Sequence, residues 1–284
     1  MNDYKKKTGQ NCGGWVHRIC FAICVVIVMF VFILPLLWIL SISLKKQIDI
    51  IAQPPKILFQ PVLDYYIKVV HNADVLKGSL NSVICTFGTL LIGFLVGIPG
   101  AYAMARFSFI GKRVMMLWIL MGLMIPLASL IIPFYMMFKR IGLLDTLSGL
   151  IIVYLLIDIP FVVWMMGINL KEVPIEIDES ATLDGCNTLQ LLVHILIPIS
   201  KPGIASAAIS CIIATWNEFL FAMILTQSKA KTAPVVISGF MSTSGMRWGE
   251  MAAVATFLII PPAVFGIAIQ KNYIRGLTAG AVKG

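Results

Sequence analysis

Six long apolar stretches constrain this chain more than any other feature of its sequence. They cover residues 19–44, 80–105, 114–138, 148–170, 203–226 and 251–270, and the only charged side chains inside them are Asp158 and Glu218. Each stretch reaches the roughly 20 residues that an α-helix needs to cross a hydrocarbon core about 30 Å thick. A helix satisfies its own backbone hydrogen bonds, as the interior of a bilayer requires. We therefore predict an all-α membrane protein with six transmembrane helices.

The overall composition agrees with a membrane protein. Hydrophobic residues make up 59% of the 284 and charged residues only 12%, whereas charged residues are about 25% of an average soluble protein. The net charge of +9 raises the question of nucleic-acid binding. The basic residues lie mostly in polar segments beside the apolar stretches, where they meet lipid headgroups, so we expect membrane lipids and no nucleic acid as partners. The six cysteines show neither metal-ligand spacing nor a disulfide framework, and no metal site is predicted.

The first apolar stretch follows a basic segment and superficially resembles a secretory signal peptide. It is much longer than the roughly 7–15 apolar residues of such a peptide, and no A-x-A cleavage site follows it. We expect a retained helix that Pro35 bends. The expected organisation is an N-terminal segment 1–18, a six-helix domain 19–270 and a tail 271–284. Lys and Arg are nearly balanced between the two sides, so the positive-inside rule does not fix the orientation.

The polar link between the fourth and fifth stretches, residues 171–202, reads as two short helices outside the bilayer. A proline followed by three acidic residues favours a helix start, because acids stabilise the positive end of the helix dipole. Gly185 suits a left-handed helix stop, and Asn187 or Thr188 can cap a second, amphipathic helix that closes at Pro198. On composition alone, this segment either receives a soluble partner or rests in the headgroups.

The spacing of residues within this link carries a specific resemblance. Glu179-Ser180-Ala181 is followed after three residues by Gly185, and after nine more by Ile195-Leu196-Ile197-Pro198. This resembles the EAA motif (E-A-A, three residues, G, nine residues, I-x-L-P) of permease subunits in binding-protein-dependent ABC importers. Ser180 replaces the usual Ala and Ile197 the usual Leu. The residues that the resemblance assigns to ATPase coupling are Glu179, Ser180, Ala181, Asp184, Gly185, Ile195 and Pro198.

Two further segments resemble the MalG-like sugar permeases within that family. Residues 216–219 read W-N-E-F, and residues 276–284 read GLTAGAVKG, like the G-L-T-A-G-x-V-K-G ending of that group. The resemblance extends over the whole chain in the order of its elements. It implies the type I ABC importer permease fold and ATP-driven import of a sugar or oligosaccharide. It also implies a multi-pass protein of the inner or cytoplasmic membrane, with both termini and the EAA loop 172–200 in the cytoplasm.

The resemblance implies several partners as well. They are a second, MalF-like permease, two ATPase subunits and an extracytoplasmic solute-binding protein that delivers the sugar. Glu179 is expected to contact a basic residue of an ATPase, and Gly185 to set the angle between the two short helices. The chain lacks a Gly-rich phosphate-binding loop with a lysine. We therefore expect no cofactor on this chain and no enzymatic activity, with ATP and Mg²⁺ held by the ATPase subunits.

Charged residues inside a membrane are costly and commonly face a cavity or a partner. Trp216, Asn217, Glu218 and Asp158 are therefore candidates for the substrate path, since a sugar needs an aromatic face and polar groups for its hydroxyls. The alternative is that these polar side chains lock neighbouring helices together.

Two peripheral segments are candidates for partner contacts. The resemblance to MalG-like permeases implies that the external loop 227–249 contacts the binding protein, with Ser238, Gly239, Phe240 and Met241 as the candidate residues, although a plain connector has the same composition. The resemblance likewise implies that the Gly-rich tail contacts the ATPases instead of fraying, with Leu277, Thr278 and Gly280 as the candidate residues.

Three other functions compete with a sugar permease. An ABC permease for a non-sugar solute would share the EAA motif but not the W-N-E-F stretch and the tail. An ion-coupled secondary transporter would be expected to carry inverted repeats and several intramembrane carboxylates. A membrane enzyme would need a catalytic motif such as HExxH or G-x-S-x-G, and the sequence contains neither.

Overall fold

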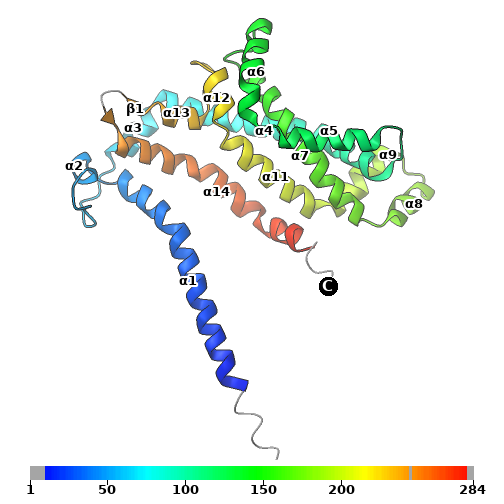
Figure 1. The fold of residues 1–284 in the computed structure, drawn as a ribbon, viewed down its shortest axis with the longest axis horizontal. Helices are drawn as coiled ribbons and strands as arrows, with labels where there is room; N and C mark the ends of the chain where they lie inside the picture. Colours follow the sequence, from blue (N-terminus) through cyan, green and yellow to red (C-terminus); the bar gives the residue numbers. More distant parts are fainter. Residues whose placement is uncertain (1–9, 243–244, 280–284) are drawn as a thin grey trace, which may run out of the picture. The chain divides into compact units, whose positions relative to one another are not determined.

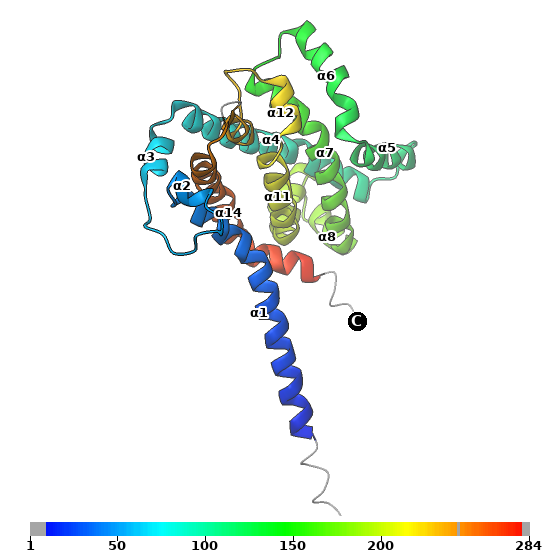
Figure 2. The same ribbon diagram turned by 60° about the vertical axis from the view of Figure 1, so that its left-hand side comes forward.

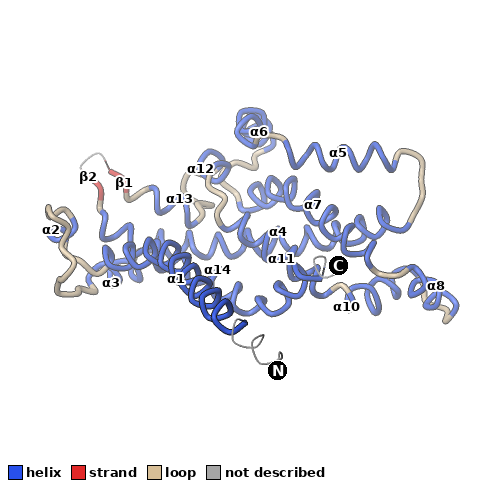
Figure 3. Tube along the Cα trace, turned by 60° about the horizontal axis from the view of Figure 1, so that its bottom comes forward, coloured by secondary structure: helices blue, strands red, loops and turns tan. Residues whose placement is uncertain are grey.

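The computed structural model describes residues 10–242 and 245–279. The described chain is almost entirely helical, as Figure 3 shows, with one two-stranded β-sheet formed by β1 and β2. The elements in chain order, coloured along the sequence in Figure 1, are α1 (Gln10–Ser43), α2 (Gln47–Ile50), α3 (Asp64–His71), α4 (Ala73–Arg106), α5 (Lys112–Met124), α6 (Leu127–Ile141), α7 (Leu147–Glu172), α8 (Ile175–Leu183), α9 (Thr188–Gln190), the π-helix η1 (Leu191–Leu196), α10 (Ile197–Ile199), α11 (Lys201–Trp216), α12 (Leu220–Leu225), α13 (Ala233–Ser238), β1 (Met241–Ser242), β2 (Gly245–Met246) and α14 (Trp248–Ala279).

The chain divides into two compact units, one of residues 1–69 with 243–257 and one of residues 70–242 with 258–284. In the first unit, α1 is a helix of 34 residues that continues through Pro35, and residues 19–38 of α1 are exposed. Polar contacts tie the following segment together: the Ser43 and Tyr66 hydroxyls are 2.7 Å apart, and Lys68 Nζ donates to Glu250 Oε1 at 3.2 Å. The second unit holds the EAA-like segment.

Helices occupy all six predicted apolar stretches, but two of the stretches are not single helices. Four helices are long and apolar enough to cross a membrane, in α1, α4, α7 and α14, and two bent pairs raise the number to as many as six. The predicted helix 114–138 is one of those pairs: α5 and α6 meet at 96°, a corner visible in Figure 2. Pro126 disfavours helical geometry at the residue before it, and Ile125 is accordingly extended, with φ −66° and ψ 126°.

The second bent pair joins residues Thr188–Ile199 to α11. The predicted helix 203–226 is itself interrupted at another point. It consists of α11 and α12, separated by residues 217–219. The Glu218 carboxylate accepts hydrogen bonds from the backbone N–H of Phe221 at 2.9 Å and of Ala222 at 3.1 Å. These amides belong to the first turn of α12, which has no helical partners for them. Glu218 therefore starts a new helix where the hydropathy pattern predicts a continuous one.

Small residues bring α4 and α7 together at the centre of the second unit. A Cβ on Gly97 would lie 2.6 Å from Cγ1 of Val162, and one on Gly88 would lie 2.9 Å from Cδ1 of Ile151. Both distances are too short for real side chains, so the two helices pack backbone against side chain at these points. Close approach through small residues is typical of helix pairs in membranes. The helix α11 packs on both α4 and α7, and the three helices form the core.

A carboxylate and two side chains of α4 hold the segment after α12. The Asp145 carboxylate, just before α7, accepts hydrogen bonds of 3.0–3.2 Å from the backbone N–H groups of the four successive residues 227–230. Asn81 Nδ2 donates to the carbonyls of Lys229 and Lys231 at 3.1 and 2.9 Å, and Ser82 Oγ accepts from the N–H of Ala233 at 2.8 Å. The loop is therefore fixed to the helix core through its backbone.

Candidate functional site

The helix α8 follows α7 after a link of only two residues. Val173 and Pro174 are both extended, with ψ of 123° and 139°, so the chain turns sharply between the two helices. The sequence suggests that Pro174 lies in the first turn of this helix, whereas Pro174 is the N-cap residue and α8 begins one residue later, at Ile175. Glu176 and Asp178 lie in the first turn of α8, where a negative charge is favourable. This arrangement places a short acidic helix directly at the end of a core helix.

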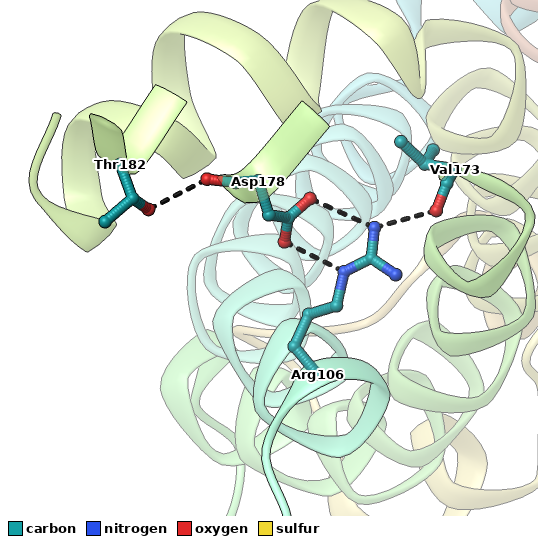
Figure 4. Close-up of polar contacts among 4 residues, drawn as sticks. All are labelled: Arg106, Val173, Asp178 and Thr182. Atoms are coloured by element: carbon teal, nitrogen blue, oxygen red, sulfur yellow. Dashed lines mark hydrogen bonds and ion pairs between the residues drawn. The ribbon is translucent and has the colours of Figure 1, made fainter. Parts of the chain in front are cut away.

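An ion pair joins α8 to the end of α4. Arg106 Nε donates to Asp178 Oδ2 at 2.9 Å, and Arg106 Nη2 donates to Asp178 Oδ1 at 3.1 Å. The same Nη2 donates to the carbonyl oxygen of Val173 at 2.9 Å, as Figure 4 shows. The two side chains are only 9% and 11% exposed. Paired, charge-assisted hydrogen bonds of this kind are among the strongest and most directional in proteins.

The sequence interpretation missed this ion pair. It treated Arg106 as a charge beside the membrane and Asp178 as an acid stabilising a helix dipole, and the two residues are 72 positions apart. Thr182 Oγ1 donates to the Asp178 carbonyl at 2.8 Å, which adds a contact within α8. The three elements that meet at the guanidinium are therefore the end of α4, the link after α7 and the first turn of α8.

The end of α8 confirms the predicted left-handed stop. Gly185 has φ +85°, and no atom lies within 4 Å of a Cβ placed there. The backbone conformation alone, and not crowding, therefore favours glycine at this position. The N–H of Cys186 donates to the carbonyl of Ala181 at 3.0 Å. Asn187 then caps α9 through a reciprocal pair of 2.9 Å hydrogen bonds with Gln190, which decides between the two caps considered from the sequence.

The second predicted helix differs from expectation in its geometry. Residues 191–196 form the π-helix η1, and Pro198 does not close the helix, because α10 continues to Ile199 and the turn comes at Ser200. A π-helical turn holds an extra residue, which shifts the backbone register just before the proline ring must be accommodated. The chain then enters α11 at an angle of 81°.

The underside of this segment is part of the apolar core. Ala181 of α8 and Leu191, Leu192 and Leu196 of η1 are buried in one cluster with residues of α4, α7 and α11. Ile195 is half-buried against the same cluster. The segment is thus anchored by apolar packing as well as by the ion pair.

The opposite side of the segment is exposed. Glu179, Ser180, Asp184 and Pro198 are exposed, and Leu183 is 89% exposed. Further exposed apolar side chains are Ile175 and Leu189. A short helix that presents leucine and carboxylate side chains to the outside, while its underside is fixed, has the form of a docking surface.

The candidate substrate-path residues lie in different environments. Asp158 is 3% exposed and accepts a hydrogen bond from Thr215 Oγ1 at 3.2 Å, which joins α7 to α11. Trp216 is buried, and Glu218 is engaged with the amides of α12. Asn217 is exposed, and its Nδ2 donates to the Ile213 carbonyl at 2.8 Å. A role in the sugar path stays a prediction, and the contacts of Asp158 and Glu218 match the alternative of locking helices.

The two peripheral candidate segments are only partly described. Ser238 ends α13, Gly239 is exposed, and Phe240 is buried at 6% exposure. Met241 begins β1. Leu277 and Thr278 lie near the end of α14, which continues beyond the predicted span end at residue 270, whereas Gly280 lies outside the described residues. Contacts of these residues with partners stay predictions.

Residues 90–279 match the family described as "Binding-protein-dependent transport system inner membrane component". The chain belongs to this family. It is a permease subunit of an ABC transporter and not an enzyme, and the family assignment decides against an ion-coupled secondary transporter.

Similar proteins include permeases named for sugar transport. The chain is 34% identical over 256 residues to the trehalose transport system permease protein SugB of Mycobacterium tuberculosis, covering 89% of this chain and 93% of that protein. It is 28% identical over 276 residues to the trehalose/maltose transport system permease protein MalG of Thermococcus litoralis, covering 95% and 98%.

A solved structure has the same fold. It is a crystal structure of a bacterial ABC transporter involved in the import of the acidic polysaccharide alginate, with a TM-score of 0.73 and 22% identity over 94% of this chain and 98% of that one. The permease fold predicted from the EAA-like spacing is thereby confirmed, and this permease has its EAA-like residues in and after α8.

Proposed function

We propose that this permease is one half of the translocation path of an ATP-driven importer for a sugar or oligosaccharide. The second half is a MalF-like permease, two ATPase subunits hold ATP and Mg²⁺, and an extracytoplasmic binding protein delivers the sugar. The sugar assignment rests on the W-N-E-F stretch, on the Gly-rich ending, and on relatives named for trehalose and for maltose. In this assignment α8 and both termini lie in the cytoplasm.

The observation that carries the proposal is the two-sided character of α8. Its underside is held by Ala181 in the core cluster and by the Arg106–Asp178 pair, whereas Leu183 and Glu179 are exposed. ATP-driven closure of the ATPases can move the membrane helices only if the docking element is fixed to them. The helix α8 meets this requirement, because one side of it is held by the core and its other side is exposed.

An uptake measurement tests the assignment of substrate. The permease is purified together with its ATPase and second permease, reconstituted into liposomes with the binding protein, and supplied with ATP and labelled trehalose, maltose or methionine. Import of a disaccharide that depends on ATP supports the proposal. Import of methionine without import of either sugar would establish the non-sugar alternative.

The variant Glu179→Lys tests the docking role of α8. Reversing the exposed charge is expected to lower the amount of ATPase that co-purifies with the permease by roughly tenfold or more, because a like charge replaces a charge-assisted contact. The matched control is Glu172→Lys, which makes the same charge change at an exposed residue at the end of α7. Equal recovery of ATPase with both variants would contradict the assignment.

A further inference from the structure

We propose that Arg106 and Asp178 are positioning residues that make α8 and α4 move as one body. The inference rests on the proposed function, since it concerns how a displacement of α8 by the ATPase reaches the membrane helices. In this view the ion pair carries part of that displacement directly to α4, in addition to the covalent path through α7.

The first argument is the place where the ion pair lies. Arg106 is the last residue of α4, and Asp178 is in the first turn of α8. The only covalent route from α8 back to the core on this side passes through Val173 and Pro174, two residues with extended backbone between the helices α7 and α8. A link of this kind can pivot, and a pivot would absorb a displacement instead of passing it on.

The second argument is the geometry of the guanidinium. Its Nε and Nη2 contact both carboxylate oxygens of Asp178, and Nη2 also contacts the carbonyl of Val173. Three contacts from one planar group fix orientation as well as distance, which a single point charge cannot do. The guanidinium therefore fixes the pivoting link and the helix beyond it at the same time.

The third argument separates this role from simple stability. The packing of α4 against α7 includes glycine contacts such as those of Gly97 with Val162 and of Gly100 with Val163, which lie six or more residues before Arg106 on the chain. The apolar underside of the segment, including Ala181 and Leu191, is buried in a core cluster to which neither Arg106 nor Asp178 belongs. Loss of the pair is therefore expected to leave the core assembled while it loosens the connection between α8 and α4.

The experiment measures the number of ATP molecules hydrolysed for each sugar imported by the complete importer in liposomes, using the disaccharide found in the uptake measurement. In Arg106→Gln we expect this ratio to rise by about two- to thirtyfold, the range expected for loss of one element of a coupling network. The amount of co-purified ATPase should stay close to that of the wild type. Arg106→Lys, which keeps the charge but not the fork, should give a smaller rise.

The matched control is Arg113→Gln, at an exposed arginine in the first turn of α5. Its ratio should equal that of the wild type. An unchanged ratio in Arg106→Gln would overturn the inference. A purely structural role would give this result through a parallel fall of uptake, hydrolysis and assembly. Failure of the wild-type importer to move any sugar would instead refute the proposed function, so the two failures can be told apart.

Discussion

The two ends of α7 are fixed by carboxylates in different ways. At its start, Asp145 accepts hydrogen bonds from the backbone amides of residues 227–230. Beyond its end, Asp178 pairs with the side chain of Arg106. The first contact depends on the path of the backbone and on one acidic residue, whereas the second depends on two side chains that must both be correct. The contact at the start of α7 therefore tolerates changes of side chain in residues 227–230, whereas the contact beyond its end does not tolerate a change of Arg106.

The difference also concerns what a contact of each kind can do. A carboxylate surrounded by four successive amides holds a loop in one conformation, because any shift of the loop breaks several hydrogen bonds together. A side-chain pair between two helices can keep its geometry while both helices move. We infer that the contact at the start of α7 holds a loop in place, whereas the contact beyond its end joins α4 to α8, the proposed ATPase docking helix, so that these two helices move together.

The largest effect is expected from Arg106→Ala. Removal of the guanidinium leaves the mostly buried Asp178 carboxylate without its ion-pair partner, which costs about 3 kcal/mol. We expect this loss to appear as local opening of α8, with its amides exchanging hydrogen roughly a hundredfold faster. Hydrogen exchange measured by mass spectrometry on the purified protein tests this. Unchanged exchange in α8 would show that the ion pair does not stabilise this helix. An equal increase in α13 would show that the effect of the pair is not confined to α8.

A smaller effect is expected from Asp145→Asn. The amide keeps one carbonyl acceptor but loses the charge and the second oxygen, at a cost of about 1–2 kcal/mol. Faster exchange should be confined to the amides of residues 227–230. The control is Lys229→Ala, because Lys229 contributes only its backbone N–H to Asp145 and its replacement should have almost no effect. A clear effect of the control would mean that the loop is held by its side chains.

The smallest expected effect is that of a pH change near neutrality on the stability contributed by the Asp145 hydrogen bonds. Burial raises the pKa of Asp145, but hydrogen bonds from the backbone N–H of Gln227, Ala230, Lys229 and Ser228 lower it more strongly, so the net pKa lies well below its usual range. The contact is therefore fully stabilising above the unfolded-state pKa, about 3.9, and weakens as the pH falls toward the folded-state pKa.

Thermal unfolding of the wild type and of Asp145→Asn in detergent tests this dependence. The difference between the two should be constant from about pH 7 to about pH 5 and should narrow below about pH 4. A difference that narrows already near neutral pH would indicate that another titrating group controls the loop.

The parts of this structure that depend on local pattern were predictable. Hydropathy located helices at the six stretches, and the spacing around Gly185 predicted both the permease fold and the left-handed stop. Prolines were less informative. Pro126 separates α5 from α6, whereas Pro35 and Pro160 lie inside unbroken helices. The outcome depends on whether neighbouring packing compensates for the lost hydrogen bond, and the sequence near a proline does not contain that information.

The contacts that define the candidate site were not predictable in the same way. The pairing of Arg106 with Asp178 requires α4 and α7 to lie side by side, and that adjacency comes from glycine contacts spread along both helices. The partners of Asp145 are backbone amides, which every residue except proline carries, so no residue type marks them. Glu218 was interpreted from its cost in a membrane, although the same cost is met here by capping α12.

The helix α4 contacts the Lys229 and Lys231 carbonyls through Asn81 and the helix α8 through Arg106. At about 1.5 Å per residue these two side chains are separated by about 37 Å along the helix axis, more than the roughly 30 Å of a hydrocarbon core. One continuous helix, α4, therefore extends between the loop that precedes α13 and the helix α8. A binding protein and an ATPase that act on these two surfaces, as proposed, would therefore both act on the same helix, at positions farther apart than the hydrocarbon core is thick.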